Sequence, residues 1–284
     1  MKTDSGPLWL VVNSASGSND EAGLAALIAQ LSAHGSAPAR VIDCSAEDLP
    51  VRAELEAGGV ATLAVFAGDG TIGAVLPPLE GWGGQVLVLP GGTTNLLAKM
   101  LHQPCETGPI IAAFASGAAR PGQRPCVRLP GHTALCEVLA GPGAKWSDVR
   151  EGLRDGDVSA VAATAIDAVK ESAGGAMVLI AEPALGHEAG YAGVRLTPAA
   201  GGLIVDGYRS DGVADLLKQG LALLQRDFRE GPHDKLGTHP QLLCRSADGG
   251  PIELMIDGER ATGATELRFS LATLALNLLA TGDG

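Results

Sequence analysis

Along the first 120 residues, apolar runs alternate with segments of helical periodicity. Four runs have the length and composition of buried strands, at 8–12, 39–43, 61–66 and 85–89. Segments that repeat apolar residues on one helical face lie at 24–31, 47–57 and 96–101. Because apolar strands separated by helices are typical of a sheet covered on both faces, this half predicts a parallel α/β sheet.

Beyond residue 130 the apolar runs become shorter and lie between turn residues. Their spacing is that of an antiparallel sheet, with runs at 177–181, 202–208, 242–246, 252–257 and 267–271. Helical patterns at 158–171 and 212–225 predict two helices among them. We therefore expect a β-rich second half that resembles an antiparallel sandwich.

The change of pattern falls near residue 120, and the length of 284 residues also suggests two domains. The segment from Ala119 contains Pro and Gly and predicts a linker. The expected domains are a three-layer α/β domain at 1–122 and a β-rich domain at 123–284. The last residues, roughly 275–284, are expected to return to the first domain.

The charge and the cysteine content narrow the function classes. The formal net charge of -12 disfavours long-range attraction to nucleic acid or to anionic bilayers. The five cysteines show no C-x-x-C spacing, which predicts buried thiols rather than disulfides or structural zinc. The N-terminus lacks the apolar core of a signal peptide, and the apolar stretch 271–280 is about half of a membrane span. We expect a soluble protein.

Three polar loops follow predicted strands of the first domain. They begin at Asn13, Gly68 and Pro90, and they are rich in Gly, Ser, Thr and Asn. Because parallel strands all end at one edge of a sheet, the loops should meet at the edge where ligands of such sheets bind.

The loop Gly68-Asp69-Gly70-Thr71 carries the clearest chemical signal. Its glycines let the backbone turn tightly and approach a phosphate, and Thr71 is a candidate cap of the following helix. Asp69 is unexpected there, because a carboxylate and a phosphate repel each other. A carboxylate in this place would hold a cation or accept a proton, and both tasks belong to phosphoryl transfer.

Two other phosphate-binding motifs fit this loop less well. Gly68, Gly70 and Gly73 satisfy G-x-G-x-x-G, but that fingerprint belongs after the first strand, and here it follows the third. No Gly-Lys-Ser/Thr follows the glycines, which argues against a Walker A loop. An ordinary tight turn would account for one such loop, but poorly for three at one sheet edge.

Together the loops resemble the three ordered motifs of the diacylglycerol kinase catalytic domain family, which includes sphingosine kinases and bacterial lipid kinases. The motifs are Asn13-Ser14-Ala15-Ser16-Gly17, Gly68-Asp69-Gly70-Thr71 and Pro90-Gly91-Gly92-Thr93-Thr94-Asn95. Near the C-terminus, Asp257-Gly258-Glu259 resembles the Asp-Gly-Glu that the family carries in its second domain. Without the upstream motifs, this Asp-Gly pair would predict only a hairpin turn.

The resemblance implies a kinase that uses ATP and Mg²⁺, with nucleotide bound by 1–122 and the acceptor bound by 123–284. It implies Asp69 and Glu259 as catalytic residues. Glu259 would be the base that accepts the proton of the acceptor hydroxyl, and Asp69 would also serve Mg²⁺ through the nucleotide. The residues implied in nucleotide binding are Asn13, Ser16, Gly17, Gly68, Asp69, Gly70, Thr71, Gly92, Thr93, Thr94 and Asn95.

The second domain departs from the family pattern in two places. Gly201 stands where bacterial members often have an Asp that holds a structural Mg²⁺, so we do not expect that metal site. Asp206 is near this position but out of register. The family's Asn-x-x-Ser-x-Gly pattern is also missing, and the segment 140–143 stands in its place.

The leading interpretation is an ATP-dependent lipid kinase that phosphorylates a diacylglycerol-like acceptor in phospholipid metabolism. One alternative is a non-catalytic family member that binds nucleotide or lipid. Another is a soluble small-molecule kinase similar to NAD kinases. The resemblance further implies a lipid substrate and, as is frequent in the family, a homodimer. From the charge, the cysteines and the lack of an anchor we expect a cytoplasmic protein with transient peripheral contact at the inner membrane surface and no nucleic acid partner.

Overall fold

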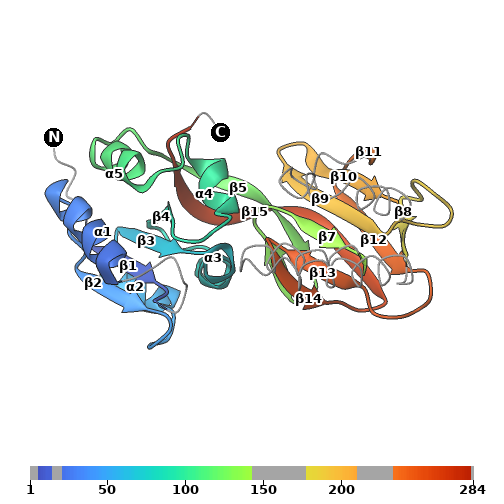
Figure 1. The fold of residues 1–284 in the computed structure, drawn as a ribbon, viewed down its shortest axis with the longest axis horizontal. Coiled ribbons are helices and arrows are strands. Elements are labelled where there is room, and N and C mark those ends of the chain that lie inside the picture. Colours follow the sequence, from blue (N-terminus) through green and yellow to red (C-terminus); the bar gives the residue numbers. More distant parts are fainter. Residues whose placement is uncertain (1–5, 15–20, 143–176, 210–232, 283–284) are drawn as a thin grey trace, which may run out of the picture. The chain divides into compact units, whose positions relative to one another are not determined.

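The computed structural model of the chain describes residues 6–14, 21–142, 177–209 and 233–282. The helices predicted at 158–171 and 212–225 lie outside these residues. The chain divides into two compact units, which are Met1–Arg124 with Thr273–Gly284, and Pro125–Ala272 (Figure 1). Among the described helices, none is long and apolar enough to cross a membrane.

The first unit is built on a parallel sheet. Its strands are β1 (Leu8–Val12), β2 (Arg40–Asp43), β3 (Thr62–Ala67), β4 (Gln85–Pro90) and the C-terminal part of β15 (Glu266–Ala280). Their order is β2-β1-β3-β4-β15, and each neighbouring pair runs parallel. All six residues of β3 are buried, as expected for a sheet that is covered on both faces.

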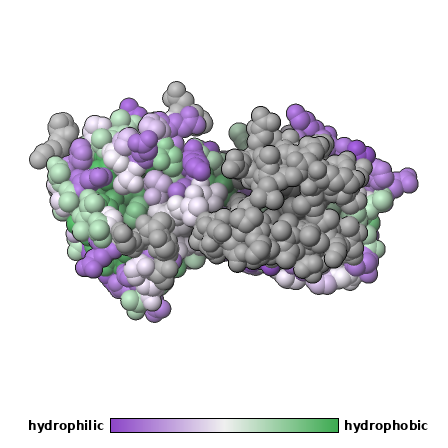
Figure 2. Space-filling view, in the orientation of Figure 1, coloured by the Kyte–Doolittle hydropathy of each residue, from purple (hydrophilic) through white to green (hydrophobic). Residues whose placement is uncertain are grey.

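Short helices connect these strands. They are α1 (Glu21–Ala33), α2 (Arg52–Ala57), α3 (Asp69–Val75), the 3-10 turn η1 (Pro77–Leu79), α4 (Leu96–Leu101) and α5 (Thr107–Ala115). In α1, Leu27 and Leu31 are buried in one cluster with the sheet and α5, and Leu24 and Ile28 pack against that cluster. This confirms the predicted apolar face of α1. Its outward face consists largely of exposed alanines, so the surface over α1 is hydrophobic in Figure 2.

The second unit is antiparallel and β-rich, and this confirms the expected fold class. One sheet has the order β11-β10-β9-β7-β13-β14, and β8, β12 and the first part of β15 form a further antiparallel group. Side chains from both groups share one hydrophobic core, as in a sandwich. The strands are β5 (Arg120–Leu129), β6 (His132–Ala134), β7 (Val138–Ala140), β8 (Val178–Glu182), β9 (Gly193–Ala199), β10 (Gly202–Tyr208), β11 (Asp234–His239), β12 (Gln241–Ser246), β13 (Glu253–Ile256) and β14 (Glu259–Thr262).

The fifteen-residue strand β15 contributes to both units. Near its start it pairs with β12, whereas Asn277 and Leu278 pair with β4. Leu279 is 2% exposed and belongs to the hydrophobic cluster of α1 and α5. The end of the chain therefore supplies a strand and core side chains to the first unit.

Two predicted segments differ from the structure. The segment from Ala119, predicted as a linker, is the start of strand β5, and its first residues are exposed, where a strand tolerates proline. The helix predicted over 47–57 begins only at Arg52. The reason is Pro50, because a residue that precedes proline is disfavoured in the helical region.

Candidate active site

The loops after β1, β3 and β4 lie at the carboxyl edge of the parallel sheet and are joined by side-chain hydrogen bonds. Asn13 Nδ2 donates to Thr71 Oγ1 at 3.0 Å, which links the first loop to the second. The N–H of Leu96 donates to Asp69 Oδ1 at 2.7 Å, which links the second loop to the third. The three predicted loops therefore meet at one edge. Residues Ser16 and Gly17 of the first motif lie outside the described residues.

The second and third loops also contact each other through their backbones. A Cβ atom on Gly92 would lie 2.6 Å from the Cα of Gly68, and one on Gly91 would lie 2.5 Å from the backbone nitrogen of Ala67. Both distances are too short for a side chain, so these glycines are required for the two loops to pack. Gly73, in contrast, has open space around the position of a Cβ. In the dinucleotide fingerprint the third glycine permits close packing of helix and strand, and Gly73 has no such role here.

The start of α3 corrects one expectation about Thr71. The helix begins at Asp69, and Gly68 is its N-cap residue. Thr71 therefore lies inside the first turn, and its hydroxyl accepts the hydrogen bond from Asn13. The prediction that Thr71 caps the helix was wrong, because the helix begins three residues earlier than a cap at Thr71 would require.

Asp69 is half-buried between the second and third loops. Burial raises the pKa of this carboxyl above its ordinary value. Hydrogen bonds from the backbone N–H groups of Leu96, Leu97 and Asn95, together with the charge of Lys99, act in the opposite direction. The side chain thus faces the start of α4 rather than open solvent.

A hydrogen-bonded cluster at the end of β2 was missed in the sequence. Asp43 Oδ1 accepts the N–H of Ser45 at 3.0 Å and its hydroxyl at 2.8 Å. Ser14 donates its hydroxyl to Asp43 Oδ2 and its N–H to Oδ1. These bonds, led by that of the Ser14 side chain, hold the pKa of Asp43 well below its usual range, so the carboxyl is a fixed negative charge beside the first loop. An acidic residue that ends the second strand of a βαβ unit is the signal that could have found it.

His102, also missed, fixes the far end of α4. Its Nε2 lies 2.9 Å from the carbonyl oxygen of Val88, and its Nδ1 lies 3.1 Å from Thr281 Oγ1. Because a carbonyl can only accept, we assign the ring proton to Nε2, and the hydroxyl of Thr281 then donates to Nδ1. Burial lowers the pKa of His102 to about 4, so the ring is neutral at physiological pH.

Comparison with known proteins identifies this part of the chain. Residues 7–123 match the diacylglycerol kinase catalytic domain. The matched segment contains all three loops, so the resemblance expected from the motifs is confirmed there. Among curated proteins, none matches the sequence.

Solved structures extend the likeness to the fold of nearly the whole chain. A diacylglycerol kinase from Bacillus anthracis str. Sterne has a TM-score of 0.63 at 16% identity, over 99% of this chain and 98% of its own. A second structure from the same strain has a TM-score of 0.63 at 17% identity, over 98% of both chains. At these identities the likeness concerns the fold.

Outside the segment that matches the diacylglycerol kinase catalytic domain, Asp257-Gly258 forms the hairpin turn between β13 and β14. Both residues have positive φ, 50° and 95°, as a two-residue hairpin of this type requires. The Asp257 carboxylate accepts the N–H groups of Leu135 at 2.6 Å, Cys136 at 2.8 Å and Glu137 at 2.9 Å. Glu259 follows as the first residue of β14, and its side chain is exposed.

The second unit holds Asp206 in a buried ion pair. Asp206 of β10 lies directly opposite Arg195 of β9, and Arg195 Nη2 is 2.8 Å from Asp206 Oδ2. Gly201 lies in the turn between these strands, with open space around the position of a Cβ. The carboxylate of Asp206 is thus neutralised by its cross-strand partner.

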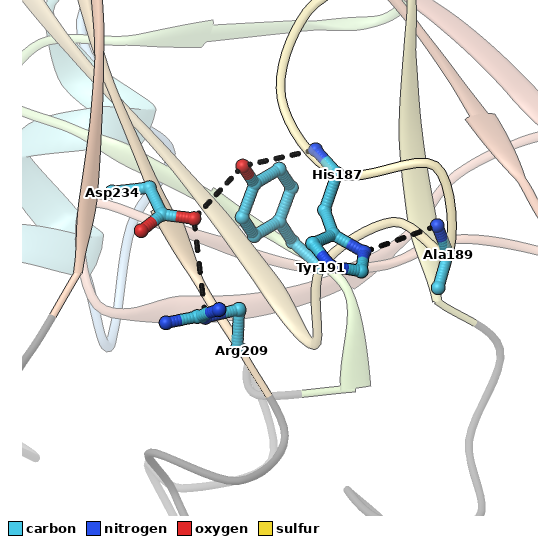
Figure 3. A network of polar contacts seen from close by, with 5 residues as sticks. All are labelled: His187, Ala189, Tyr191, Arg209 and Asp234. Atoms are coloured by element: carbon cyan, nitrogen blue, oxygen red, sulfur yellow. Dashed lines mark hydrogen bonds and ion pairs between the residues drawn. The ribbon is translucent and has the colours of Figure 1, made fainter.

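A second polar network in this unit surrounds the buried ring of Tyr191 (Figure 3). Its hydroxyl donates to Asp234 Oδ2 at 3.1 Å and accepts the N–H of His187 at 3.2 Å. Asp234 also lies 3.9 Å from Arg209. A Cβ atom on Gly207 would lie 2.5 Å from the ring, so the glycine makes room for the aromatic side chain. The network satisfies the polar end of a core residue.

Proposed function

We propose that the chain is an ATP-dependent lipid kinase, which transfers the γ-phosphoryl group of ATP to a lipid hydroxyl. The observation that carries this proposal is the junction of three loops at the carboxyl edge of β1, β3 and β4. That edge is where ligands of parallel sheets bind, and it lies within the segment that matches the diacylglycerol kinase catalytic domain.

The nucleotide would bind at this junction through backbone N–H groups and short polar side chains. The residues that we propose for it are Asn13, Gly68, Asp69, Gly70, Thr71, Gly92, Thr93, Thr94 and Asn95, with Ser16 and Gly17 of the first motif. Glycines and hydroxyl or amide side chains suit phosphate oxygens, because they donate hydrogen bonds without adding bulk.

The described residues fit a Mg²⁺ ion that arrives with the nucleotide. They contain no cluster of three His, Cys, Asp or Glu side chains that could hold a metal alone. Mg²⁺ commonly binds through one or two carboxylates and substrate phosphates, and Asp69 is the carboxylate between the second and third loops at this edge. Such an ion would neutralise charge on the transferred phosphoryl group. Asp69 would hold it through its carboxylate, which also accepts the N–H of Leu96.

Glu259 is the proposed general base. An alcohol is a poor nucleophile until its proton is accepted, and an exposed carboxylate can accept it. In the proposed reaction the hydroxyl O–H bond breaks and Glu259 takes the proton. The hydroxyl oxygen forms a bond to the γ-phosphorus while the bond from that phosphorus to ADP breaks. The products are a lipid phosphomonoester and ADP.

The test is transfer of labelled γ-phosphate from ATP to a panel of lipids in mixed micelles with Mg²⁺. Diacylglycerol, a sphingoid base and a polyprenol would form the panel, and we expect label in at least one lipid phosphate. Transfer to a water-soluble acceptor without detergent would instead indicate a kinase similar to NAD kinases. ATP binding without transfer to any acceptor would indicate a non-catalytic member of the family.

A further inference from the structure

The short helix α4 lacks a cap from its own sequence. Its N-cap residue Asn95 has a φ of 52° and makes no side-chain hydrogen bond to the helix. The Asn95 side chain is occupied in its own loop, because Oδ1 accepts the N–H of Gly92 and Nδ2 donates to the Gly92 carbonyl, both at 2.8 Å. The first N–H groups of α4 therefore need an acceptor from elsewhere.

That acceptor is Asp69, which lies 27 positions earlier in the chain. Its Oδ1 accepts the N–H of Leu96 at 2.7 Å, and the N–H groups of Asn95 and Leu97 also donate to the carboxylate. A negative charge at this end of a helix is also favoured by the helix dipole. Asp69 thus does for α4 what a local Ser, Thr or Asp does for most helices.

The same contact controls the loop that leads into α4. Gly92 packs on the backbone of Gly68, the residue before Asp69, with no space for a Cβ atom between them. The far end of α4 is held separately, since His102 bonds to the Val88 carbonyl of β4. A change at Asp69 would therefore release the N-terminal end of α4 and the loop 90–95, while the other end stays attached to the sheet.

We propose that Asp69 is a positioning residue, which caps α4 from a neighbouring loop and thereby holds the loop 90–95 in its nucleotide-binding shape. The role of the loop 90–95 in nucleotide binding rests on the proposed function, whereas the capping of α4 does not. Capping of α4 depends on an acceptor oxygen of Asp69 at one position. Holding a cation depends instead on the negative charge of Asp69.

Two single substitutions separate the oxygen from the charge. Asp69→Asn keeps an acceptor oxygen at the same distance from the backbone and removes the charge. Asp69→Glu keeps the charge and moves the carboxylate by one methylene, away from the N–H of Leu96. Asp48→Asn, at an exposed carboxylate, is the matched control for loss of one negative charge.

The primary measurement is hydrogen exchange of the amides at 95–97 in the full chain without nucleotide. Loss of a helix cap should speed this exchange about tenfold in Asp69→Glu, whereas Asp69→Asn and the control should stay within about threefold of the parent. The second measurement is the Kd for ATP of Asp69→Glu, which should weaken about tenfold because the loop 90–95 loses its nucleotide-binding shape.

The inference is overturned if Asp69→Glu exchanges at the parental rate, or if Asp69→Asn exchanges as fast as Asp69→Glu. It is also overturned if Asp69→Asn loses ATP affinity while Asp69→Glu keeps it, because charge would then be what matters. Hydrogen exchange without nucleotide does not depend on kinase activity. If the parent protein failed to bind ATP, the proposed function would fail while the exchange result still decided whether Asp69 caps α4.

Discussion

Among single residues, the aspartates of two motifs share one structural task, which is to accept backbone N–H groups from a distant segment. Asp69 accepts from the start of α4, and Asp257 accepts from residues 135–137. The motifs could be found in the sequence, because a glycine follows each aspartate directly. The partners could not be found, since they lie 27 and more than 100 positions away.

Replacement of Asp257 should destabilise the second unit. Asp257→Ala would leave the N–H groups of three residues without their acceptor, and each unsatisfied buried group costs about 1–3 kcal/mol. We expect the free energy of unfolding to fall by about 3 kcal/mol or more in urea denaturation. The free energy of unfolding should fall less in Asp257→Asn, because one acceptor oxygen remains.

Asp248 supplies the matched control for this measurement. It lies in an exposed turn, where its carboxylate accepts the N–H of Gly250 and the hydroxyl of Ser246, both at 2.8 Å. Asp248→Ala should change the free energy of unfolding by less than about 1 kcal/mol, because water replaces the lost acceptor. A similar small effect for Asp257→Ala would show that its three hydrogen bonds do not hold the hairpin.

His102 should make stability depend on pH in a defined window. Burial holds its pKa at about 4 in the folded state, below the ordinary value of 6.5, so the unfolded chain takes up a proton first as the pH falls. The contribution of the neutral His102 ring to the free energy of unfolding is complete above pH 6.5 and is lost between pH 6.5 and 4. Its upper limit is about 3 kcal/mol.

The check is a comparison of the parent with His102→Gln, which does not titrate. Urea denaturation at several pH values between 7 and 4 should show the parent losing stability more steeply than the variant. Other titrating groups cancel in this comparison because both proteins contain them. Parallel pH profiles would contradict the assignment of a buried neutral imidazole.

At the scale of secondary structure, the apolar pattern located most elements and the loops between them. The bounds of β1, α4 and β10 agree with the predicted ranges. Asn13 and His102 follow the first two apolar runs, and Gly202 begins the third. The strand β5 was not expected, since its first half is exposed and contains proline. Only the pairing of β5 with β6 and β15 makes that segment a strand, and such pairing is not encoded locally.

The C-terminal strand gives a prediction at this scale. Leu279 is 2% exposed in the core cluster of the first unit, although it lies almost at the end of the chain. Leu279→Ala should lower the free energy of unfolding by about 2–4 kcal/mol, because it removes buried methyl groups and leaves a cavity. Thr273→Ala, at an exposed position of β15, is the control and should change little. An equally small effect of both substitutions would show that the strand end is not part of the core.

At the scale of the whole molecule, the sequence predicted a parallel α/β half and an antiparallel half, and the structure has both. The composition of the strands explains this success, since strands buried on both faces and strands buried on one face have different hydrophobic patterns. The candidate site was predicted in part. Asn13, Asp69 and the glycines of the loops could be found by motif. Asp43 could have been found only by its place at the end of the second strand, whereas His102 becomes visible only through its contacts.

In the proposed reaction, nucleotide bound at the loop junction donates a phosphoryl group to a lipid hydroxyl whose proton passes to Glu259. The most direct measurement compares lipid phosphorylation by the parent and by Glu259→Gln, with the Kd for ATP determined in parallel. We predict that turnover falls by about 100-fold or more, the usual contribution of a general base, while the Kd for ATP changes less than about threefold. Full turnover in Glu259→Gln would show that Glu259 does not act as the general base.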